Sequence, residues 1–426
     1  MLIEFRVANF KSIQERQVLS LRASKGRELT DSHTFGVPPV AGGPDINMKL
    51  LRSAALYGAN AAGKSNFLQA MRAMQAIVSG SALEKRRGDP LPVAPFRLDP
   101  GARDAPSEFE AAFFSGGVRY QYGFAATTER IVEEWLFAYP RNRAQRWFRR
   151  AWAPAQSGYE WELGAFLSGE KALWQKATRD NALFLSTAVQ LNSRQLQPVY
   201  DWFAKTLHLA NVSGWSPIFS AELCETDCKE QVLNFLKAAD LDIHDVRVRK
   251  DPFDPKFLPG DMSAPVKQMI SEQMENKEVL EIQTVHRDSE GKEVAFGFDQ
   301  ESDGTQKVFS FAGPWIDSLQ NGHVLFVDEL HDNLHPQLAK FLVRRFHGRD
   351  TNPSNAQLVF TAHETSILSQ DLMRRDQIWF CEKDRRHATR LYPLTDFHPR
   401  KGRENLELAY RSGRYGALPY IREAQG

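Results

Sequence analysis

Two short stretches of this chain carry the residue types that bind and cleave phosphate anhydrides. Residues 58–65 read Gly-Ala-Asn-Ala-Ala-Gly-Lys-Ser and fit the pattern G-x-x-x-x-G-K-[ST], in which backbone N–H groups of a glycine-rich loop surround phosphate oxygens. Residues 324–329 form an apolar run that ends in the acidic pair Asp328 and Glu329. Such a loop and such a strand are the usual parts of a nucleotide-hydrolysing site. Because the two stretches lie far apart in the sequence, we expect a nucleotide-binding fold that a large insertion interrupts.

The phosphate loop has an expected role for each of its chemical groups. Gly58 and Gly63 allow backbone N–H groups to converge on phosphate oxygens, and the helix that follows adds the positive end of its dipole. Lys64 brings a positive charge toward the β and γ phosphates, and the Ser65 hydroxyl is placed to bind magnesium. The alternative, an ordinary glycine-rich turn, is disfavoured by the flanking strand and helix patterns. The residues expected to bind the nucleotide here are Gly58, Ala59, Asn60, Ala61, Ala62, Gly63, Lys64, Ser65 and Asn66.

The acidic pair and a downstream histidine supply the other expected chemical groups. Asp328, at the end of an apolar strand, is suited to hold Mg²⁺, with Ser65 as the second protein ligand. Glu329 beside it is placed to polarise the attacking water. His363 follows the next apolar strand in order, where it would sense the γ phosphate. We therefore expect Lys64, Glu329 and His363 to be catalytic, with ATP and Mg²⁺ as cofactors.

Other interpretations of the same region stay open. The acidic pair would also suit a surface position that caps the next helix. His331, Asp332, His335 and His363 together suggest a metal-dependent hydrolase, although the first three belong to one loop after the acidic strand. A small GTPase is disfavoured, because residues 276–279 (Asn-Lys-Glu-Val) lack the aspartate of the guanine-reading pattern N-K-x-D. ATP is therefore the preferred nucleotide.

Residues 301–306, Glu-Ser-Asp-Gly-Thr-Gln, precede a helical pattern and have two interpretations. In the first, Ser302 or Asp303 is an ordinary N-cap. In the second, Ser302 and Gly304 form another anion-binding helix terminus, shortly before the acidic strand. Pro314 is expected to kink this helix.

The elements around the phosphate loop follow from the hydrophobic pattern. Residues 2–7 alternate as a half-buried strand, and 18–21 read as its antiparallel neighbour. Residues 26–48 form a loop rich in Gly, Pro, Asp and Ser that leads into a strand at 50–57. Apolar residues within 67–78 recur at helical spacing. The loop therefore lies between a strand and a helix, as its function requires.

The rest of the chain divides by pattern into strands and helices. Residues 108–139 are strand-like, with a tight hairpin at Gly116-Gly117. Residues 168–239 look mainly helical and lack heptads, so we interpret them as an inserted helical domain. Continuous apolar runs that alternate with helices nearer the C-terminal end indicate a parallel sheet buried on both faces. The remaining expected strands are 246–248, 279–285, 324–327, 357–361 and 377–380, with a helix at 336–346.

Composition and charge place the chain among ordinary globular proteins. The 54 lysines and arginines nearly cancel the 53 aspartates and glutamates, so no global positive field indicates binding to nucleic acid or membrane. The first residues lack a basic segment followed by an apolar one, and no apolar stretch approaches the roughly 20 residues of a bilayer span. Three cysteines cannot form a disulfide framework in a chain of 426 residues. We expect a cytoplasmic protein with reduced thiols and no membrane partner.

One local segment mixes arginines with aromatic residues. Residues 141–150 include Arg146, Arg149 and Arg150 beside a tryptophan and a phenylalanine. Such a mixture can bind phosphates and stack on bases. More often it is a solvated face with its aromatic residues turned inward. If the first interpretation holds, replacing the three arginines should weaken salt-sensitive binding to duplex nucleic acid.

ABC-type ATPases carry a signature motif where this chain has residues 301–306, called the signature segment below. The order of phosphate loop, large insertion, signature segment, acidic strand and histidine resembles the ABC-type ATPase heads of the RecF and SMC proteins. The start Asn9-Phe10-Lys11-Ser12-Ile13 also resembles their N-terminal strand and turn. Over essentially its full length, the chain is similar to bacterial AAA-family ATPases of the abortive-infection and restriction-linked Rlo type. The segments that carry this similarity are 95–99 (Pro-Phe-Arg-Leu-Asp), 301–305 (Glu-Ser-Asp-Gly-Thr) and 414–420 (Arg-Tyr-Gly-Ala-Leu-Pro-Tyr).

The resemblance implies a head-to-tail dimer, or a higher homo-oligomer, that holds ATP between subunits. Each ATP would lie between the phosphate loop of one subunit and Ser302 and Gly304 of the other. Lys11 and Ser12 would approach the nucleotide, and His363 would be the switch histidine.

The resemblance also assigns roles to the segments around the acidic strand. Leu334-His335-Pro336 would form the loop that links the two nucleotide sites. The signature segment departs from the common form L-S-G-G-Q at Asp303 and Thr305. These two departures would affect the geometry of dimer closure and the rate of ATP turnover.

These observations and the resemblance lead to one expected architecture and function. The fold class is α/β, an ABC-type P-loop ATPase head with two lobes, a mixed sheet, an antiparallel N-terminal sheet and an inserted helical domain. The expected domains are 1–165 with the phosphate loop, 166–245 as the insertion, and 246–426 with the signature, acidic strand and histidine. We expect ATP-driven dimerisation and hydrolysis to regulate a partner effector in antiphage defence. The resemblance implies a small nuclease, often of Toprim type, as that effector. The alternative is a RecF-like ATPase clamp that binds DNA during repair or maintenance, so contact with nucleic acid stays open.

Overall fold

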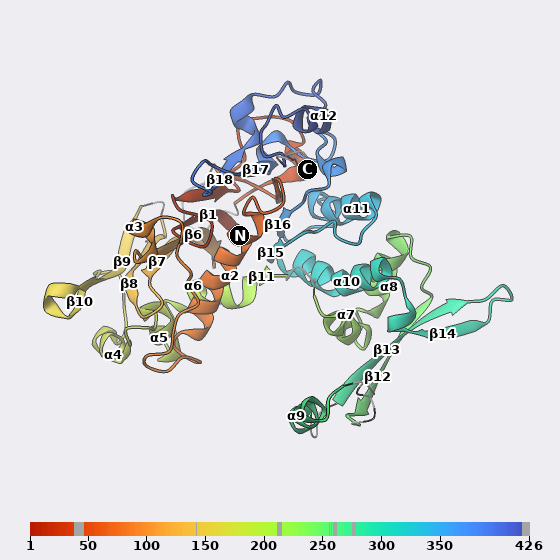
Figure 1. The fold of residues 1–426 in the computed structure, drawn as a ribbon, viewed down its shortest axis with the longest axis horizontal. Helices are drawn as coiled ribbons and strands as arrows, with labels where there is room; N and C mark the ends of the chain where they lie inside the picture. The colour runs from red at the N-terminus through yellow and green to blue at the C-terminus, as the bar shows by residue number, and fades with distance from the viewer. Residues whose placement is uncertain are drawn as a thin grey trace, which may run out of the picture. The chain divides into compact units, whose positions relative to one another are not determined.

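The chain forms two compact units in a computed structural model that describes residues 1–37, 47–141, 143–210, 215–254, 256, 258, 262–274 and 278–419. Unit 1 comprises Met1–Val212, Ser318–Asp332 and Ala339–Gly426, and unit 2 comprises Ser213–Asp317 and Asn333–Leu338. Figure 1 gives the elements of both units along the chain. The chain is therefore interrupted by an insertion, and it is a mixed α/β protein as expected.

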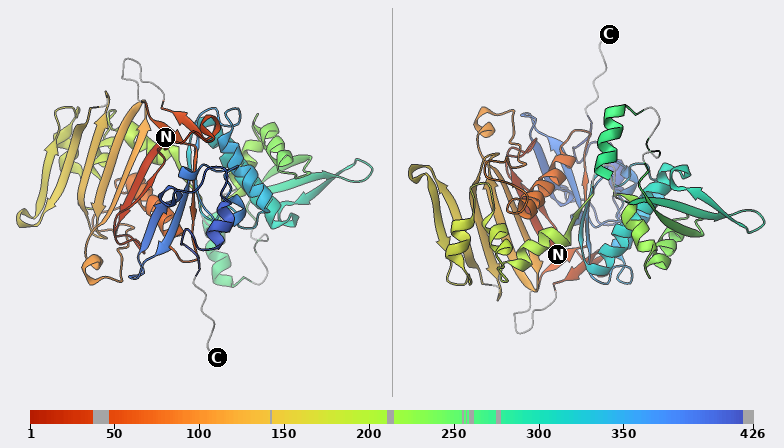
Figure 2. Two further views of the ribbon diagram at one scale, coloured as in Figure 1. Left: turned by 90° about the horizontal axis from the view of Figure 1, so that it is seen from above. Right: turned by 90° about the horizontal axis from the view of Figure 1, so that it is seen from below.

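The first sheet of unit 1 is antiparallel and has seven strands in the order β10-β9-β8-β7-β6-β1-β2 (Figure 2). The expected pairing of the strands at 2–7 and 18–21 is confirmed. Gly116 and Gly117 have positive φ angles of 54° and 76°, as the expected tight hairpin requires. The strands are β1 (Leu2–Ala8), β2 (Gln17–Ser20), β6 (Ser107–Ser115), β7 (Val118–Ala126), β8 (Ile131–Tyr139), β9 (Gln145–Ala153) and β10 (Gly158–Leu163).

The second sheet of unit 1 has six strands in the order β11-β15-β16-β5-β17-β18. All neighbours are parallel except β17 and β18, and every residue of β5, β15 and β16 is buried. This burial explains the continuous apolar runs and confirms the expected parallel sheet. The strands are β5 (Ser53–Tyr57), β11 (Leu207–Leu209), β15 (Val324–Val327), β16 (Gln357–Thr361), β17 (Ile378–Lys383) and β18 (Thr389–Pro393).

Helix α2 (Lys64–Gly80) and both sheets of unit 1 share one hydrophobic core. The Phe5 ring of β1 meets the Phe67 ring of α2 edge to face, with centroids 5.3 Å apart. The Gln357 side chain at the start of β16 accepts a hydrogen bond from Leu2 N at 2.6 Å and donates to the carbonyls of Leu2 and Leu51, both at 3.0 Å. These contacts fix the antiparallel sheet against the parallel one and hold the helix that begins at the phosphate loop.

The remaining elements of unit 1, which include a two-stranded sheet of β3 and β4, differ in detail from the expected pattern. The expected loop at 26–48 contains a short helix and a strand, and residues 38–46 of it lie outside the described residues. The expected strand at 50–57 is split at Arg52 between β4 and β5. The elements are α1 (Thr30–His33), β3 (Thr34–Gly36), β4 (Lys49–Leu51), α3 (Pro100–Arg103), α4 (Lys171–Ala177), α5 (Phe184–Gln190), α6 (Gln197–Asp201) and α12 (Leu406–Arg411), with α11 (Pro336–His347) mostly in this unit.

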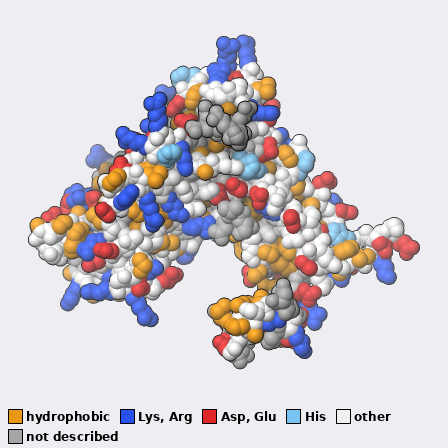
Figure 3. All heavy atoms as spheres, viewed as in Figure 1, with side chains coloured by type: hydrophobic (Ala, Val, Ile, Leu, Met, Phe, Trp, Pro, Cys, Tyr) orange, Lys and Arg blue, Asp and Glu red, His pale blue; other side chains and the backbone are white. Residues whose placement is uncertain are grey.

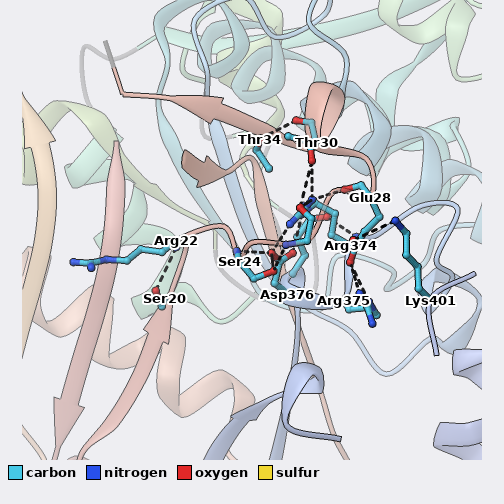
Figure 4. A network of polar contacts seen from close by, with 12 residues as sticks. Ser20, Arg22, Ser24, Glu28, Thr30, Thr34, Arg374, Arg375, Asp376 and Lys401 are labelled. Carbon is cyan, nitrogen blue, oxygen red and sulfur yellow. Dashed lines mark hydrogen bonds and ion pairs between the residues drawn. The ribbon is translucent and has the colours of Figure 1, made fainter. Parts of the chain in front are cut away.

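A network of charged side chains fastens the segment before β3 to the segment before β17 (Figure 4). The buried Arg374 guanidinium donates to both carboxylate oxygens of Asp376, at 2.9 and 2.6 Å. Ser24 donates to Asp376 from its N–H and its hydroxyl, and Arg375 pairs with Glu28 at 2.9 Å. Buried charges are tolerated when they are paired and hydrogen-bonded in this way.

Unit 2 is the inserted part, and it is not purely helical. It contains an antiparallel sheet in the order β12-β13-β14 beside its helices, so the expectation of an inserted helical domain needs correction. Residues 166–212, expected in the insertion, belong to unit 1, because β11 completes the parallel sheet there. The elements are α7 (Pro217–Cys224), α8 (Lys229–Ala238), β12 (Asp245–Pro252), α9 (Ala264–Met274), β13 (Glu278–Arg287), β14 (Glu293–Gly297) and most of α10 (Asp303–Asn321).

Hydrophobic side chains are exposed on unit 2. They gather over α9, where Val266 and Met269 are 40% and 53% exposed (Figure 3).

Helix α10 runs without interruption through Pro314, although that residue cannot donate a backbone hydrogen bond. The Ser220 hydroxyl lies against the helix at this point. It accepts a hydrogen bond from Gly313 N at 2.9 Å and donates to the Ser310 carbonyl at 3.4 Å, which Pro314 leaves without its usual helical donor. Neither α10 nor any other helix of the described residues has the length and apolarity to cross a bilayer.

Candidate nucleotide-binding site

The phosphate loop connects the end of β5 to the start of α2, as its function requires. Gly58, Ala61 and Gly63 have positive φ angles of 153°, 62° and 107°. A Cβ atom at Gly58 would overlap the Cys381 carbonyl oxygen, and one at Gly63 would overlap Thr389 Oγ1. Both glycines are therefore required by the backbone conformation and by the close approach of other chain segments.

Lys64 is the first residue of α2, and its side chain turns back under the loop. It is only 6% exposed, and its Nζ donates to the carbonyls of Gly58 at 2.7 Å and Ala59 at 3.0 Å. Burial lowers the pKa of the Lys64 ammonium, while the nearby carboxylates of Glu329 and Asp328 act in the opposite direction. A buried cation thus lies at the base of the loop, where an entering polyanion would gain most from it.

A cavity of about 460 Å³ lies over the loop. The fold brings four separate parts of the chain to its wall: residues 60–66, Glu329 after β15, His363 after β16, and Lys383 at the end of β17. The expected catalytic groups therefore share one cavity. Gly58 and Ala59, the first two residues of the loop, are not among the residues that line this cavity. Ala59 N instead donates a hydrogen bond to the Ala417 carbonyl.

The acidic pair is held in place by Thr361 at the end of β16. The Thr361 hydroxyl donates to Asp328 Oδ1 at 2.6 Å and accepts from Glu329 N at 2.8 Å. Asp328 is buried, and Glu329 has a left-handed backbone with a φ of 50°. A non-glycine residue in that conformation is uncommon and is often found at functional sites. The turn at Glu329 directs the second acid to the cavity.

His363 contacts His331, the second residue after the acidic pair. The two rings are nearly perpendicular, with centroids 3.9 Å apart, and His331 Nε2 lies 2.9 and 3.0 Å from the two ring nitrogens of His363. His331 therefore lies behind the cavity-lining histidine.

Lys11 and Ser12 take different positions beside the loop. Ser12 Oγ accepts a hydrogen bond from Asn66 Nδ2 at 2.7 Å and lies 2.8 Å from Thr389 Oγ1. The Lys11 ammonium contacts Gln69 Oε1 instead, and Lys11 lines a neighbouring cavity of about 490 Å³. Ser12 is therefore part of the loop's support, whereas Lys11 faces away from the cavity that contains Glu329.

Ser302 and Gly304 belong to unit 2, where their local role is clear. The Ser302 hydroxyl accepts from Thr305 N at 3.1 Å and lies 2.9 Å from Thr305 Oγ1, so Ser302 caps α10. A Cβ at Gly304 would lie 3.2 Å from the Asn333 carbonyl oxygen. The capping interpretation of this segment thus matches its geometry, and contact with a second subunit's nucleotide stays a prediction.

Three arginines of residues 141–150 are paired with glutamates. Arg150 is completely buried and pairs with Glu134 at 2.9 Å. Arg149 pairs with Glu133 and Glu162, and Arg146 pairs with Glu162 at 2.5 Å. Glutamates therefore engage these three guanidiniums, while Arg141 and Arg143 are exposed, and contact of this run with nucleic acid stays a prediction.

Three residues of the site belong to no recognised motif and were not predicted as site residues from the sequence. Thr361 had the clearest signal, because it ends the buried strand two residues before His363. Lys383 ends another strand of the parallel sheet, at the edge where the phosphate loop lies. Thr389 gave no signal, since only the fold of β17 and β18 brings it to the loop.

Comparison with known proteins gives a family match. A family model described as "AAA domain, putative AbiEii toxin, Type IV TA system" matches residues 53–369. Among solved structures, the chain is similar to CbiO1 from Clostridium perfringens, part of the ABC transporter complex CbiONQ, with 10% identity and a TM-score of 0.30. That alignment covers 98% of this chain and 96% of CbiO1. No curated protein sequence matches the chain.

Proposed function

Because the chain belongs to this AAA-domain family and is an ATP hydrolase, we propose that its ATP cycle regulates a partner effector in antiphage defence. The enzymatic part is supported by one observation above the others. Lys64, Glu329 and His363 line a single cavity although they come from distant parts of the sequence. The defence part is supported by the family's description, whose words are "putative AbiEii toxin, Type IV TA system". A toxin–antitoxin system has two components, so the family's description also supports a partner protein. We propose that this partner is an effector nuclease.

The residues of the cavity fit a magnesium-bound triphosphate. The cavity is lined by the buried Lys64 ammonium, the Ser65 hydroxyl, the loop backbone and the Glu329 carboxylate, while the adjacent Asp328 lines the neighbouring 490 Å³ cavity. Together these groups are the donor set that such a ligand needs. Ser65 and Asp328 would hold Mg²⁺, which when bound neutralises charge on the phosphates. Lys64 would bind the terminal phosphates, Glu329 would orient the attacking water, and His363 would contact the γ phosphate.

We propose that the working form is a head-to-tail dimer. Ser302 and Gly304 would then contact the nucleotide held by the phosphate loop of the second subunit. The capped N-terminus of α10 supports this role, because the free N–H groups and the dipole of a 19-residue helix attract anions. ATP would join the two subunits, and hydrolysis would release them and change how the effector is held.

The function is tested with Lys64→Ala and Glu329→Gln in cells challenged with phage. We expect both variants to lose ATP turnover and protection, because one lacks the phosphate-binding cation and the other lacks the base. Glu160→Gln, an exposed glutamate on β10, is the matched control and should protect like the wild type. Circular dichroism checks that each variant is folded. Protection retained by both site variants would contradict the proposal.

A further inference from the structure

The phosphate loop is held from outside by a part of the chain more than 300 positions downstream. Ala59 N donates to the Ala417 carbonyl at 2.9 Å, and the Cys381 carbonyl closes off the space at Gly58. Thr389 Oγ1 donates to the Ala62 carbonyl at 2.9 Å. The loop's backbone conformation is therefore not set by residues 58–65 alone.

Among the residues that hold the loop, Thr389 links several segments through its hydrogen bonds. It is 1% exposed, its N–H donates to the Ser12 carbonyl at 2.7 Å, and its hydroxyl lies 2.8 Å from Ser12 Oγ. Each hydroxyl has one proton, and that of Thr389 goes to the Ala62 carbonyl, which can only accept. Ser12 must therefore donate to Thr389, while it accepts from Asn66 Nδ2 at 2.7 Å. The result is a directed series of hydrogen bonds from Asn66 through Ser12 and Thr389 to Ala62.

The geometry of the peptide bond connects this series to phosphate binding. The Ala62 carbonyl and the Gly63 N–H belong to one planar trans peptide, so they point in opposite directions. When Thr389 fixes the carbonyl, the Gly63 N–H is directed away from β18. Ala62 and Gly63 both line the 460 Å³ cavity. The two hydroxyls also pack where Gly63 lacks a Cβ, because such an atom would overlap Thr389 Oγ1 and lie 2.9 Å from Ser12 Oγ.

We propose that Thr389, together with Ser12, is a positioning residue that orients the phosphate loop for nucleotide binding. The inference rests on the proposed nucleotide site and extends it to a residue that no motif marks. Thr389 does not line the cavity. It acts by holding the Ala62 carbonyl, and through it the N–H groups that would receive a phosphate.

The test compares Thr389→Val, which keeps the shape and removes the hydroxyl, with Thr389→Ser, which keeps the hydroxyl. A lost hydrogen bond to a buried carbonyl should weaken ATP binding about tenfold in Thr389→Val. The phosphates need the loop equally in the ground state and the transition state, so we expect KM to rise while kcat changes little. Thr389→Ser should bind and hydrolyse ATP like the wild type. ATP binding is measured by calorimetry and turnover by phosphate release.

Thr34→Val is the matched control for lost stability. Thr34 is also buried, and its hydroxyl donates to the Thr30 carbonyl at 2.7 Å, but it lies in β3, away from the loop. We expect this variant to lower the melting temperature without changing KM. Ser12→Ala breaks the same series one residue earlier, so it should raise KM even if Thr389→Val does not fold.

The possible outcomes separate this inference from the proposed function. A wild-type KM in Thr389→Val or Ser12→Ala would overturn the role of Thr389, and so would an equal rise in KM in Thr34→Val. If the wild-type protein itself neither bound nor hydrolysed ATP, the nucleotide site would be overturned first, and the positioning role with it.

Discussion

Thr361 shows how one side chain can organise a whole site. Its hydroxyl serves both acids, since it donates to Asp328 and accepts from the backbone of Glu329. The left-handed turn at Glu329 would otherwise lack a fixed partner at that N–H. The strain at Glu329 is therefore stabilised by a residue from the adjacent parallel strand.

We predict that Thr361→Val reduces kcat for ATP hydrolysis by about 10- to 100-fold, the range typical for residues that orient metal ligands. The variant keeps the volume but removes both hydrogen bonds to the acidic pair. Steady-state phosphate release at saturating ATP, over a range of Mg²⁺ concentrations, measures the effect. Thr361→Ser should restore most of the activity. Unchanged kcat and unchanged Mg²⁺ dependence in Thr361→Val would show that the acids do not need this support.

At the scale of elements, the parallel sheet explains why the site forms where it does. Strands β5, β15 and β16 are neighbours that run in the same direction, so their carboxyl ends meet at one edge. The phosphate loop, the acidic pair and His363 each follow one of these strands. Loops after such strands are where α/β proteins bind ligands. The periodicity of the sequence was enough to predict the strands, but their order in the sheet was not.

Helices α1 and α11 meet in unit 1 through two buried histidines. The rings of His33 and His347 have centroids 3.7 Å apart. His33 Nε2 lies 2.9 Å from the Leu372 carbonyl, and His347 Nε2 lies 2.8 Å from Ser53 Oγ. Burial lowers the pKa of both imidazoles, and nearby arginine guanidiniums lower it further. The two histidines are therefore neutral in the folded chain at pH 7.

This contact predicts that acid destabilises unit 1. Because each folded pKa lies below the unfolded value of about 6.5, the unfolded chain binds more protons as the pH falls. The stabilisation is complete above pH 6.5 and is lost below it, by up to about 1.4 kcal/mol per pH unit for each histidine. We expect His347→Gln to show a smaller decrease in unfolding free energy between pH 7 and pH 5. Urea titrations at several pH values measure it.

The control for that measurement is His398→Gln, which removes an exposed histidine. It should keep the wild-type dependence of unfolding free energy on pH. An unchanged dependence in His347→Gln would mean that the buried pair does not cause the acid sensitivity.

At the scale of the whole molecule, the chain is one nucleotide-binding unit interrupted by a second unit. The expected boundaries at 165 and 245 do not match this division. Residues 166–212 contain helices, which suggested an insertion, but they end in β11, whose backbone pairs with β15. Such a pairing between distant strands leaves no periodic pattern in either segment, so helical content was a poor guide to the boundary.

The proposed dimer predicts that two inactive variants can restore activity when mixed. Lys64→Ala damages the phosphate loop, and Gly304→Glu places a negative charge at the proposed phosphate-facing end of α10. A head-to-tail dimer of the two has one site with a normal loop and a normal helix end. We therefore expect the mixture to regain ATPase activity, up to about one quarter of the wild-type value from random pairing of two sites. Phosphate release from each variant and from the mixture is the measurement.

The matched control is a mixture of Lys64→Ala with Glu329→Gln. Both changes affect the same side of the proposed site, so no pairing of these chains creates an intact one. Glutamate is compatible with the first turn of a helix. Because a Cβ at Gly304 would lie 3.2 Å from the Asn333 carbonyl oxygen, that neighbour must shift slightly, and circular dichroism checks that Gly304→Glu is folded. Activity that stays absent in the first mixture, or that returns in the control mixture, would rule out the proposed arrangement.

The sequence by itself determined the local parts of this protein. A glycine-rich loop between a strand and a helix, and an apolar strand that ends in acids, depend on neighbouring residues and can be read directly. Only the tertiary structure decided which distant groups support them: Thr361 under the acidic pair, Thr389 beside Gly63, and Lys383 at the cavity. It also decided that Arg150 is buried against Glu134. The physical reason is that these contacts join side chains far apart in the chain, and their energies depend on burial and orientation that no short pattern records.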